Sequence, residues 1–338
     1  MNKLKILTFI GLINLLIGEL SSQDLHFSQF YYNHQSANPA LVSNYYGDKR
    51  FGVNYRHQWL SVPVPYLSIS MIYDTKFNLK SKKDQIGLGF GLDYDQAGDS
   101  KLSVAKIIGE VAYTRILNRN NSLSFGLNIG GAQRRLSNEL LRWDVQWNGD
   151  RYDANIGSKE TYKQTGSFFA DLGVGAAYHY NYSQRTKLTL SGAVFHLNKP
   201  DQNFYGASSI KAKLPMRNVY GASAQVGVGK VMDLILGGQF QQQEDYKEQV
   251  YSGRLRFYMN QKPGSLLNAL IGCNVRIGDA FIPNFGFEYN NWLVSGSYDL
   301  NTSQFKTATN QRGGPELTVQ YIFRSVKPSS IYKKCPIY

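Results

Sequence analysis

The five histidines are the first candidates for acid–base or metal chemistry in this 338-residue chain. Three lie near the N-terminus (His26, His34 and His57), and His179 and His196 lie in the middle of the sequence. The spacing of the N-terminal three matches no familiar set of metal ligands. We therefore expect no metal site among them.

A histidine that acts as a general base is usually oriented by a carboxylate. Asp171 is the carboxylate that a hairpin would bring to His196, provided that the turn centres near Ser183 and Gln184. A shift of one residue in the register would place the two on opposite faces. No nucleophile lies at a dependable spacing from this pair. We expect a structural pair, no catalytic residues and no enzymatic activity.

The two cysteines, Cys273 and Cys335, are too few for a disulfide framework or a metal cluster. The sequence therefore predicts neither a bound metal nor a cofactor.

One long connection, residues 136–166, combines aromatic and charged side chains in a way that suits recognition. Exposed aromatics among charges suggest a surface that contacts a protein or a glycan. The alternative is a loop that packs its own aromatics over the molecule. The candidate partner-binding residues are Trp143, Trp147, Tyr152, Tyr162, Arg142 and Arg151.

The elements that must position these side chains are β-strands, and the sequence pattern predicts them. In residues 86–94 large apolar residues alternate with glycine or aspartate, so one face is apolar and the other is small or polar. Similar alternation recurs at residues 123–130, 171–179, 268–277 and 317–324. Such a two-faced repeat along a whole chain is the signature of a transmembrane β-barrel. A soluble secreted sandwich is the alternative.

The pattern predicts an all-β transmembrane antiparallel β-barrel of about 14 strands, an even number typical of bacterial barrels. Connections that follow even-numbered strands are short, as periplasmic turns are, and the longest connections follow odd-numbered strands, as extracellular loops do. An even count also puts both termini on the periplasmic side. The predicted strands span residues 50–59, 66–76, 85–95, 102–117, 122–135, 167–181, 186–197, 216–228, 231–243, 247–260, 267–278, 281–289, 291–300 and 315–325.

The chain divides into four parts. Residues 1–22, basic and then apolar, resemble a secretory signal peptide. Residues 23–49 are predicted to lie in the periplasm or in the lumen, because Asn38-Pro39 breaks any strand. Residues 50–325 form the barrel, and residues 326–338 form a basic periplasmic tail.

Composition agrees with this interpretation. The chain has 24 Tyr and 18 Phe, as aromatic girdles require, and a mean hydropathy of −0.36, as polar lumenal residues require. The net charge of +13 is dispersed along an exported chain. We therefore expect contacts with outer-membrane lipid and periplasmic partners rather than with nucleic acid. The predicted location is the outer membrane of a Gram-negative bacterium.

Short motifs mark both ends of the chain. The opening motifs are His-Phe-Ser-Gln, Asn-Pro-Ala and Tyr-Arg-His-Gln-Trp, and the closing ones are Gly-Pro-Glu-Leu and a terminal Cys-Pro. Together these motifs resemble those of the PorP/SprF family of type IX secretion outer-membrane proteins. Leu41-Val42-Ser43 follows Asn-Pro-Ala where the family usually has Tyr-Ala-Gly. The motif residues are Phe27, Ser28, Gln29, Asn38, Pro39, Tyr55, Arg56, Gln58, Trp59, Glu316, Cys335 and Pro336.

The resemblance implies a non-enzymatic role in type IX secretion and gliding motility. It implies support for the secretion or surface anchoring of an adhesin with a type B C-terminal sorting domain, and contact with periplasmic envelope-spanning components. We expect the Phe27-Ser28-Gln29 segment and the Lys333-Lys334 tail to dock those components. The alternative is a passive or substrate-selective channel of the fatty-acid-transporter kind, since fourteen strands can enclose an open or a plugged lumen.

Overall fold

The computed structural model describes residues 24–59, 66–79, 84–98, 100–137, 142–157, 165–204, 212–304 and 306–324. The predicted signal peptide, Tyr162, Cys335, Pro336 and the basic tail lie outside these residues. None of the described helices is long and apolar enough to cross a membrane.

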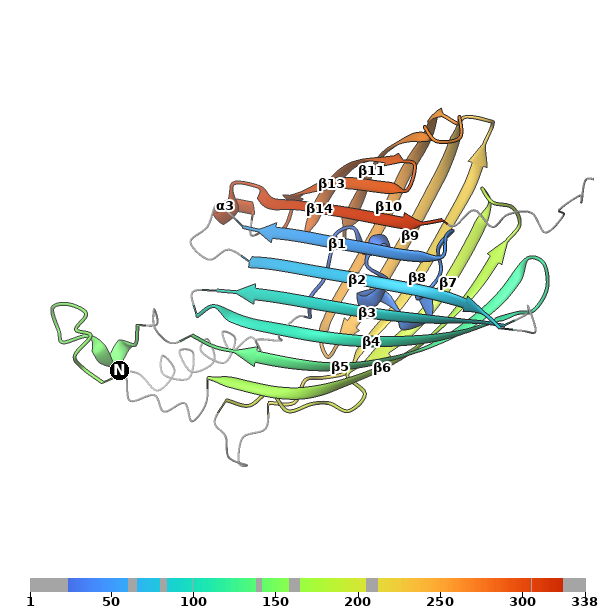
Figure 1. Cartoon of the computed structure of the whole chain (residues 1–338). Helices are drawn as coiled ribbons and strands as arrows, with labels where there is room; N and C mark the ends of the chain where they lie inside the picture. Colours follow the sequence, from blue (N-terminus) through green and yellow to red (C-terminus); the bar gives the residue numbers. More distant parts are fainter. Residues whose placement is uncertain are drawn as a thin grey trace, which may run out of the picture.

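Fourteen antiparallel strands make up the barrel in the described part of the chain (Figure 1). They are β1 (Lys49–Gln58), β2 (Tyr66–Asn78), β3 (Asp84–Ala97), β4 (Leu102–Ile116), β5 (Asn121–Arg135), β6 (Gly166–Asn181), β7 (Lys187–Phe195), β8 (Arg217–Val228), β9 (Met232–Gln243), β10 (Tyr246–Asn260), β11 (Leu267–Arg276), β12 (Ala280–Tyr289), β13 (Trp292–Asn301) and β14 (Arg312–Phe323).

Each strand pairs with its neighbours in sequence, and β1 pairs with β14, so the sheet closes on itself. The predicted fold class, with its fourteen strands, is confirmed. Most strand ends fall within one or two residues of the prediction. The largest difference is at β14, which begins three residues earlier because Arg312 still pairs with Leu300 across an irregular register.

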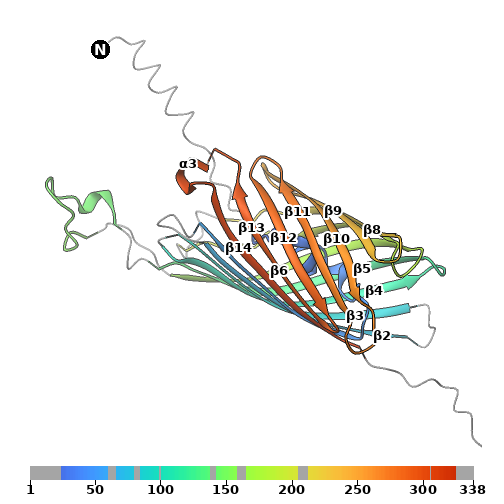
Figure 2. The same cartoon turned by 90° about the horizontal axis from the view of Figure 1, so that it is seen from above.

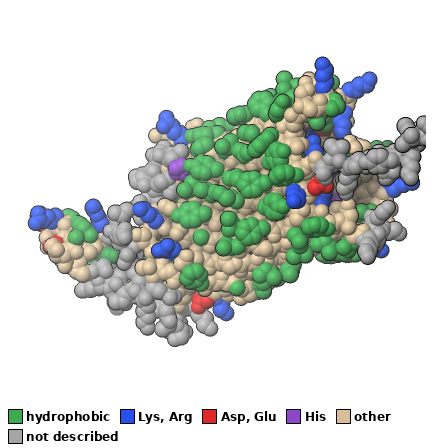
Figure 3. All heavy atoms as spheres, viewed as in Figure 1, with side chains coloured by type: hydrophobic (Ala, Val, Ile, Leu, Met, Phe, Trp, Pro, Cys, Tyr) green, Lys and Arg blue, Asp and Glu red, His purple; other side chains and the backbone are tan. Residues whose placement is uncertain are grey.

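The two faces of the strands alternate as the sequence pattern predicts. On β5, Leu127 points outward and is 43% exposed, while its neighbour Asn128 points inward and is 3% exposed. On the face of the barrel seen in Figure 3, hydrophobic side chains gather in a broad band over the strands. Apolar residues outside and polar residues inside are what a barrel in a bilayer requires.

The connections differ in length between the two ends of the barrel. Residues 136–165 and 196–216 join strands at one end, which we call the long-loop end. Connections at the other end, the short-turn end, include residues 117–120, 182–186 and 229–231. Short turns and long loops segregate as predicted.

Residues 24–48 fold back inside the barrel and form what we call the plug (Figures 1 and 2). It contains the short helices η1 (Phe30–Tyr32), α2 (His34–Ala37) and η2 (Pro39–Leu41). Asn33 and Asn38 cap α2 and η2 by accepting hydrogen bonds from the backbone nitrogens of Ser36 and Ala40. The barrel core is therefore a polar interface between the plug and the lumenal wall.

Candidate functional site

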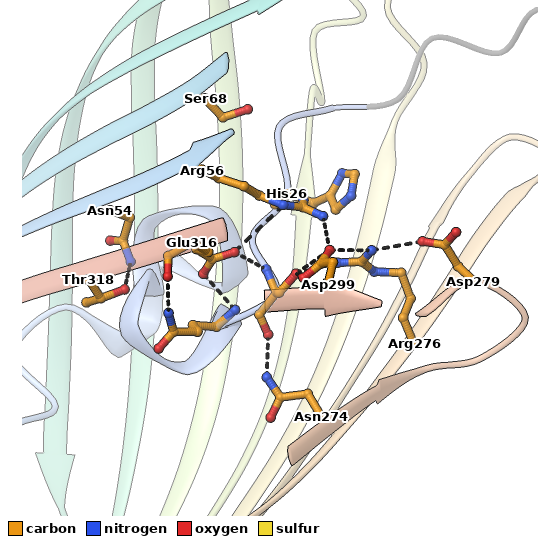
Figure 4. A network of polar contacts seen from close by, with 12 residues as sticks. His26, Asn54, Arg56, Ser68, Asn274, Arg276, Asp279, Asp299, Glu316 and Thr318 are labelled. Atoms are coloured by element: carbon orange, nitrogen blue, oxygen red, sulfur yellow. Dashed lines mark hydrogen bonds and ion pairs between the residues drawn. The ribbon is translucent and has the colours of Figure 1, made fainter. Parts of the chain in front are cut away.

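The plug is fixed to the long-loop end of the lumen by a buried carboxylate. Both oxygens of Glu316 on β14 accept hydrogen bonds from consecutive backbone nitrogens, those of Ser28 at 2.7 Å and Gln29 at 2.8 Å (Figure 4). Charge-assisted hydrogen bonds of this kind are the stronger ones in proteins. Glu316 therefore holds the main chain of the plug rather than a side chain.

A second carboxylate completes this cluster. Asp299 on β13 accepts a hydrogen bond from the Ser28 hydroxyl at 2.8 Å and one from Arg56 at 2.7 Å. Arg276 on β11 lies 3.2 Å from Asp299 and donates to the Ser28 hydroxyl at 2.7 Å. Arg56 also donates to the carbonyl oxygen of His26 at 2.7 Å. Ser28 is thus surrounded by residues from the first, eleventh, thirteenth and fourteenth strands.

These contacts correct one expectation. The sequence analysis assigned the Phe27-Ser28-Gln29 segment to docking of periplasmic machinery, but these residues are 3%, 0% and 0% exposed inside the barrel. Glu316 and Asp299 satisfy their polar groups, so no surface is left for a partner. β1 and β14 do meet at the short-turn end as an even count predicts, but the plug turns back and carries Asp24 toward the long-loop end.

Asp24 makes a second attachment through the predicted Asp–His pair. Nδ1 of His196 lies 2.7 Å from Asp171, and Nε2 lies 2.8 Å from Asp24. Lys106 donates to Asp171 at 2.9 Å, and Nε of Arg217 lies 3.3 Å from Asp24. Asp171 and His196 therefore meet as the hairpin geometry predicts, together with a second carboxylate, Asp24, that sequence reasoning missed.

Electrostatic interactions in this cluster favour the charged forms of His196 and Asp24. Burial alone would lower the pKa of His196, but the carboxylates of Asp24 and Asp171 outweigh it and raise the pKa above 6.5. Burial would raise the pKa of Asp24, but His196 and Arg217 hold it well below its usual range. Both ring nitrogens of His196 can donate only when the ring is protonated. The cluster is arranged to hold a cationic histidine, not to supply a free base.

The pKa of His26 shifts in the opposite direction to that of His196. Burial lowers its pKa to about 4, despite Glu248 at 3.6 Å. A neutral ring is therefore expected at physiological pH. The ring lies beside the cluster of Arg56 and Asp299 without carrying charge into it.

Asn38 and Pro39 place the centre of the plug against the barrel wall. The Asn38 side-chain amide donates to the carbonyl oxygens of Ala176 on β6 and Gly192 on β7, at 3.0 Å and 2.9 Å. Lumenal glycines permit this approach. A Cβ at Gly126 on β5 would lie 2.2 Å from the backbone nitrogen of Ala40, and one at Gly175 on β6 would lie 2.0 Å from Asn38.

A third attachment lies at the short-turn end. Arg50 on β1 pairs with Asp74 on β2 at 2.7 Å, and the same guanidinium lies 2.7 Å from Nδ1 of His34. Asp74 also accepts a hydrogen bond from the backbone nitrogen of Ser43 at 3.1 Å. The plug is therefore tied to the wall along its whole length.

Two cavities flank the plug in the part of the lumen that the structure describes. The larger, about 910 Å³, lies toward the long-loop end and is lined by Asp24, Gln35 and Lys106 among others. The smaller, about 690 Å³, lies toward the short-turn end and is lined by Tyr31, Tyr32 and Lys187 among others. Plug side chains line both, from opposite sides.

Two of the remaining family motif residues lie in the lining of the larger cavity. Gln58 and Trp59 line it, and Trp59 packs edge-on against Tyr66 at 4.7 Å between ring centroids. Tyr55 lies on the outer face of β1 and is 38% exposed. Motif residues at distant sequence positions thus meet at the plug, although Tyr55 serves the outer surface.

The candidate partner-binding loop extends beyond the barrel at the long-loop end (Figure 1). It contains the single-turn helix η3 (Asp144–Gln146), preceded by Trp143, and a bridge between Trp147 and Tyr152. Arg142 lies over the Tyr152 ring at 4.9 Å, Trp147 is 57% exposed and Arg151 is exposed. The loop carries its own local structure and leaves one large aromatic open to solvent.

Sequence reasoning missed most of the charged wall residues. Asp74, Asp299, Arg50 and Arg276 each occupy a lumenal position on an alternating strand, and this signal was present in the sequence. Among the described residues, no group of three or more histidines, cysteines and carboxylates could hold a metal ion.

Comparisons with known proteins gave one family match and several matches of the overall fold. The family model described as type IX secretion system membrane protein PorP/SprF matches residues 19–321. The toluene transporter TbuX from Ralstonia pickettii is 11% identical, with 85% of this chain and 92% of that chain covered and a TM-score of 0.50. A Pseudomonas aeruginosa FadL homologue is 9% identical, with 85% of this chain and 93% of that chain covered, and its TM-score is also 0.50. These likenesses show the fold alone. No curated protein matched the sequence.

Proposed function

Because the chain belongs to the PorP/SprF family of type IX secretion system membrane proteins, we propose that it supports the secretion or surface anchoring of a partner adhesin. The proposed partner carries a type B C-terminal sorting domain. The proposed location is the outer membrane of a Gram-negative bacterium, and the proposed role is not enzymatic. The single observation that carries this proposal is the family match, which runs through nearly the whole barrel.

In this proposal the long-loop end faces outward and the short-turn end faces the periplasm, as loop lengths favour. The loop with Trp147 exposed then offers an aromatic surface to a secreted protein. Envelope-spanning components of the secretion system contact the short-turn end.

The absence of catalysis is part of the proposal. His196 has a carboxylate at each ring nitrogen, and Asp171 is engaged by Lys106 as well. A histidine held in this way has no ring nitrogen left to take a proton from a substrate. This arrangement supports a structural role for the cluster.

A channel of the fatty-acid-transporter kind is the second candidate. The fold likeness to TbuX and to a FadL homologue favours it. The plug weighs against passive flow, because it is hydrogen-bonded to the wall at both ends of the lumen.

Purification of the tagged barrel from native membranes tests the two candidates. The adhesin role predicts that a large secreted protein elutes with the barrel and is lost when the barrel gene is deleted. The channel role predicts solute conductance by the purified barrel in planar bilayers. Conductance without any secreted companion would overturn the adhesin proposal.

A further inference from the structure

The smaller cavity, at the short-turn end, is strongly basic. Its lining contains six lysines and arginines but a single acidic residue, Glu288. The larger cavity is nearly balanced, with five lysines and arginines against six carboxylates. The basic residues of the smaller cavity are Arg50, Lys76, Arg119, Lys187, Arg254 and Arg256.

Arg254 on β10 is the buried cation of this cavity that most lacks a charged partner among the described residues. It is 8% exposed, and no carboxylate of the described residues lies within ion-pair distance of it. Its guanidinium stacks on the Tyr31 ring at 3.4 Å and donates to the Tyr32 hydroxyl at 3.0 Å, but its buried Nε has no hydrogen-bond partner. A buried charge is costly unless it is paired.

Three other cations of the cavity are also without a carboxylate among the described residues. Lys187 is half-buried at the start of β7, and Arg119 is exposed in the turn between β4 and β5. Lys76 donates only to the backbone carbonyls of Ser43 and Tyr45. By contrast, Arg50 and Arg256 are paired, with Asp74 and Glu288.

The positions of these cations on two walls of the barrel favour an extended ligand. Lys76 lies on β2, while Lys187 and Arg254 lie on β7 and β10, on the other side of the closed barrel. An extended peptide points alternate side chains to opposite sides, so acidic residues along it would reach both walls.

The neutral lining also fits a peptide. Asn118, Asn121, Asn181 and Gln225 line the cavity. The Asn121 amide is engaged by Asn118 and Tyr178, and the Gln225 amide nitrogen donates to Asp233. The Asn118 amide nitrogen, the Gln225 amide oxygen and the Asn181 amide remain to offer donors and acceptors. A peptide backbone needs both, whereas a polyphosphate presents acceptors only. Because residues of two short turns border the cavity, it reaches the end of the barrel, where a chain can enter.

We propose that this basic cavity binds an extended acidic segment of a periplasmic polypeptide. The assignment to the periplasm rests on the orientation given under the proposed function. Lys187 and Arg254 pair with carboxylates of the segment, and Arg119 meets it at the entrance.

Fluorescence anisotropy of a fluorescein-labelled hexaglutamate peptide with the purified full-length barrel in detergent tests this. Binding is expected, and it should weaken as salt is added. Hexaglutamine and hexalysine should not bind. Lys187→Gln and Arg254→Gln should each weaken hexaglutamate binding about tenfold, since each removes a charged contact.

Lys247→Gln is the matched control, because Lys247 is an exposed lysine of the other cavity. It should leave binding unchanged. If Arg254→Gln fails to fold, Lys187→Gln combined with Arg119→Gln serves instead, since neither side chain is fully buried.

Absence of hexaglutamate binding would overturn the proposal. Equal binding by wild type and both cavity variants would do the same, as would binding of tripolyphosphate without hexaglutamate. Detergent-solubilised protein exposes both ends, so a negative result would leave the adhesin proposal and its co-purification test untouched.

Discussion

Asp299 is the residue on which the long-loop end of the plug most depends. One carboxylate serves Arg56, Arg276 and the Ser28 hydroxyl, and all of these groups are buried. Two buried guanidinium groups need nearby negative charge, and Asp299 lies within ion-pair distance of both. Loss of the Asp299 charge would leave less negative charge near the buried Arg56 and Arg276 than is needed to offset the free-energy cost of burying them.

Asp299→Asn should therefore destabilise the folded barrel. Removing one partner of a buried ion pair costs about 3–5 kcal/mol. The temperature at which the barrel loses its fast gel mobility in detergent should fall. Asp279→Asn is the control, because Asp279 also pairs with Arg276 but is 43% exposed, where an ion pair contributes about 0–1 kcal/mol. Equal shifts for the two variants would contradict this account.

Docking of Asp24 should depend on pH through His196. Because its pKa is raised above 6.5 in the docked state, its contribution is fully present below pH 6.5. The contribution is lost as pH rises through the raised value. Hydrogen-exchange protection of residues 24–29, corrected for the intrinsic rate, should therefore fall between pH 6 and pH 9.

His196→Gln should remove this pH dependence, since glutamine does not titrate. The pKa of Asp24 is depressed, so its own contribution is present above about pH 4 and lost only in stronger acid. Protection that stays constant from pH 6 to pH 9 in the unaltered protein would refute the role of His196.

At the scale of elements, the glycines of the strands explain how a plug fits a fourteen-stranded barrel. Gly126 and Gly175 present no side chain where η2 and Asn38 approach the wall. The alternation of large residues with glycine therefore does more than keep the inner face free of large apolar side chains. It also leaves space for the plug backbone.

Gly126→Leu should displace the centre of the plug while β5 still pairs. The new side chain would collide with Pro39 and Ala40, and overpacking of this kind costs about 1–3 kcal/mol. Increased proteolysis within residues 30–45 would report the displacement. Gly131→Leu, on the outer face of the same strand with no atom within 4 Å, should leave proteolysis unchanged. Similar cleavage in both variants would show that steric contact is not the cause.

The strands could be predicted from the sequence, whereas for residues 23–49 the sequence left two placements open, the periplasm and the lumen. Period-two alternation is a local signal, and it located all fourteen strands. The plug has no period, because its short helices are held by side chains rather than by a repeating face. Ser28 and Glu316 are 288 residues apart, and only the closed register brings them together. Asp171 and His196 were predictable because one hairpin links them.

At the scale of the whole molecule, a lumen that is occupied by the plug directs attention to the ends of the barrel. If the long-loop end faces outward, the loop of residues 136–165 is its largest outward feature. Deleting residues 138–159 should leave a folded barrel, because loop tips tolerate shortening when strands are intact.

The same deletion should release the partner adhesin into the medium. Immunoblots of cells and culture supernatant would measure this, with heat-dependent gel mobility as the control for barrel assembly. An adhesin that stays attached to cells with a normal amount of the shortened barrel would exclude this loop as the docking site.

The attachment of Ser28 and Gln29 to Glu316 also sets an order of assembly. The plug begins at Asp24 in the described chain, whereas Glu316 lies on the last strand, which closes the barrel against β1. Contacts of such large sequence separation form slowly, because the entropy cost of closing the loop comes first. We therefore expect the plug to reach its place late in assembly, when the last strand that carries Glu316 is already in the barrel.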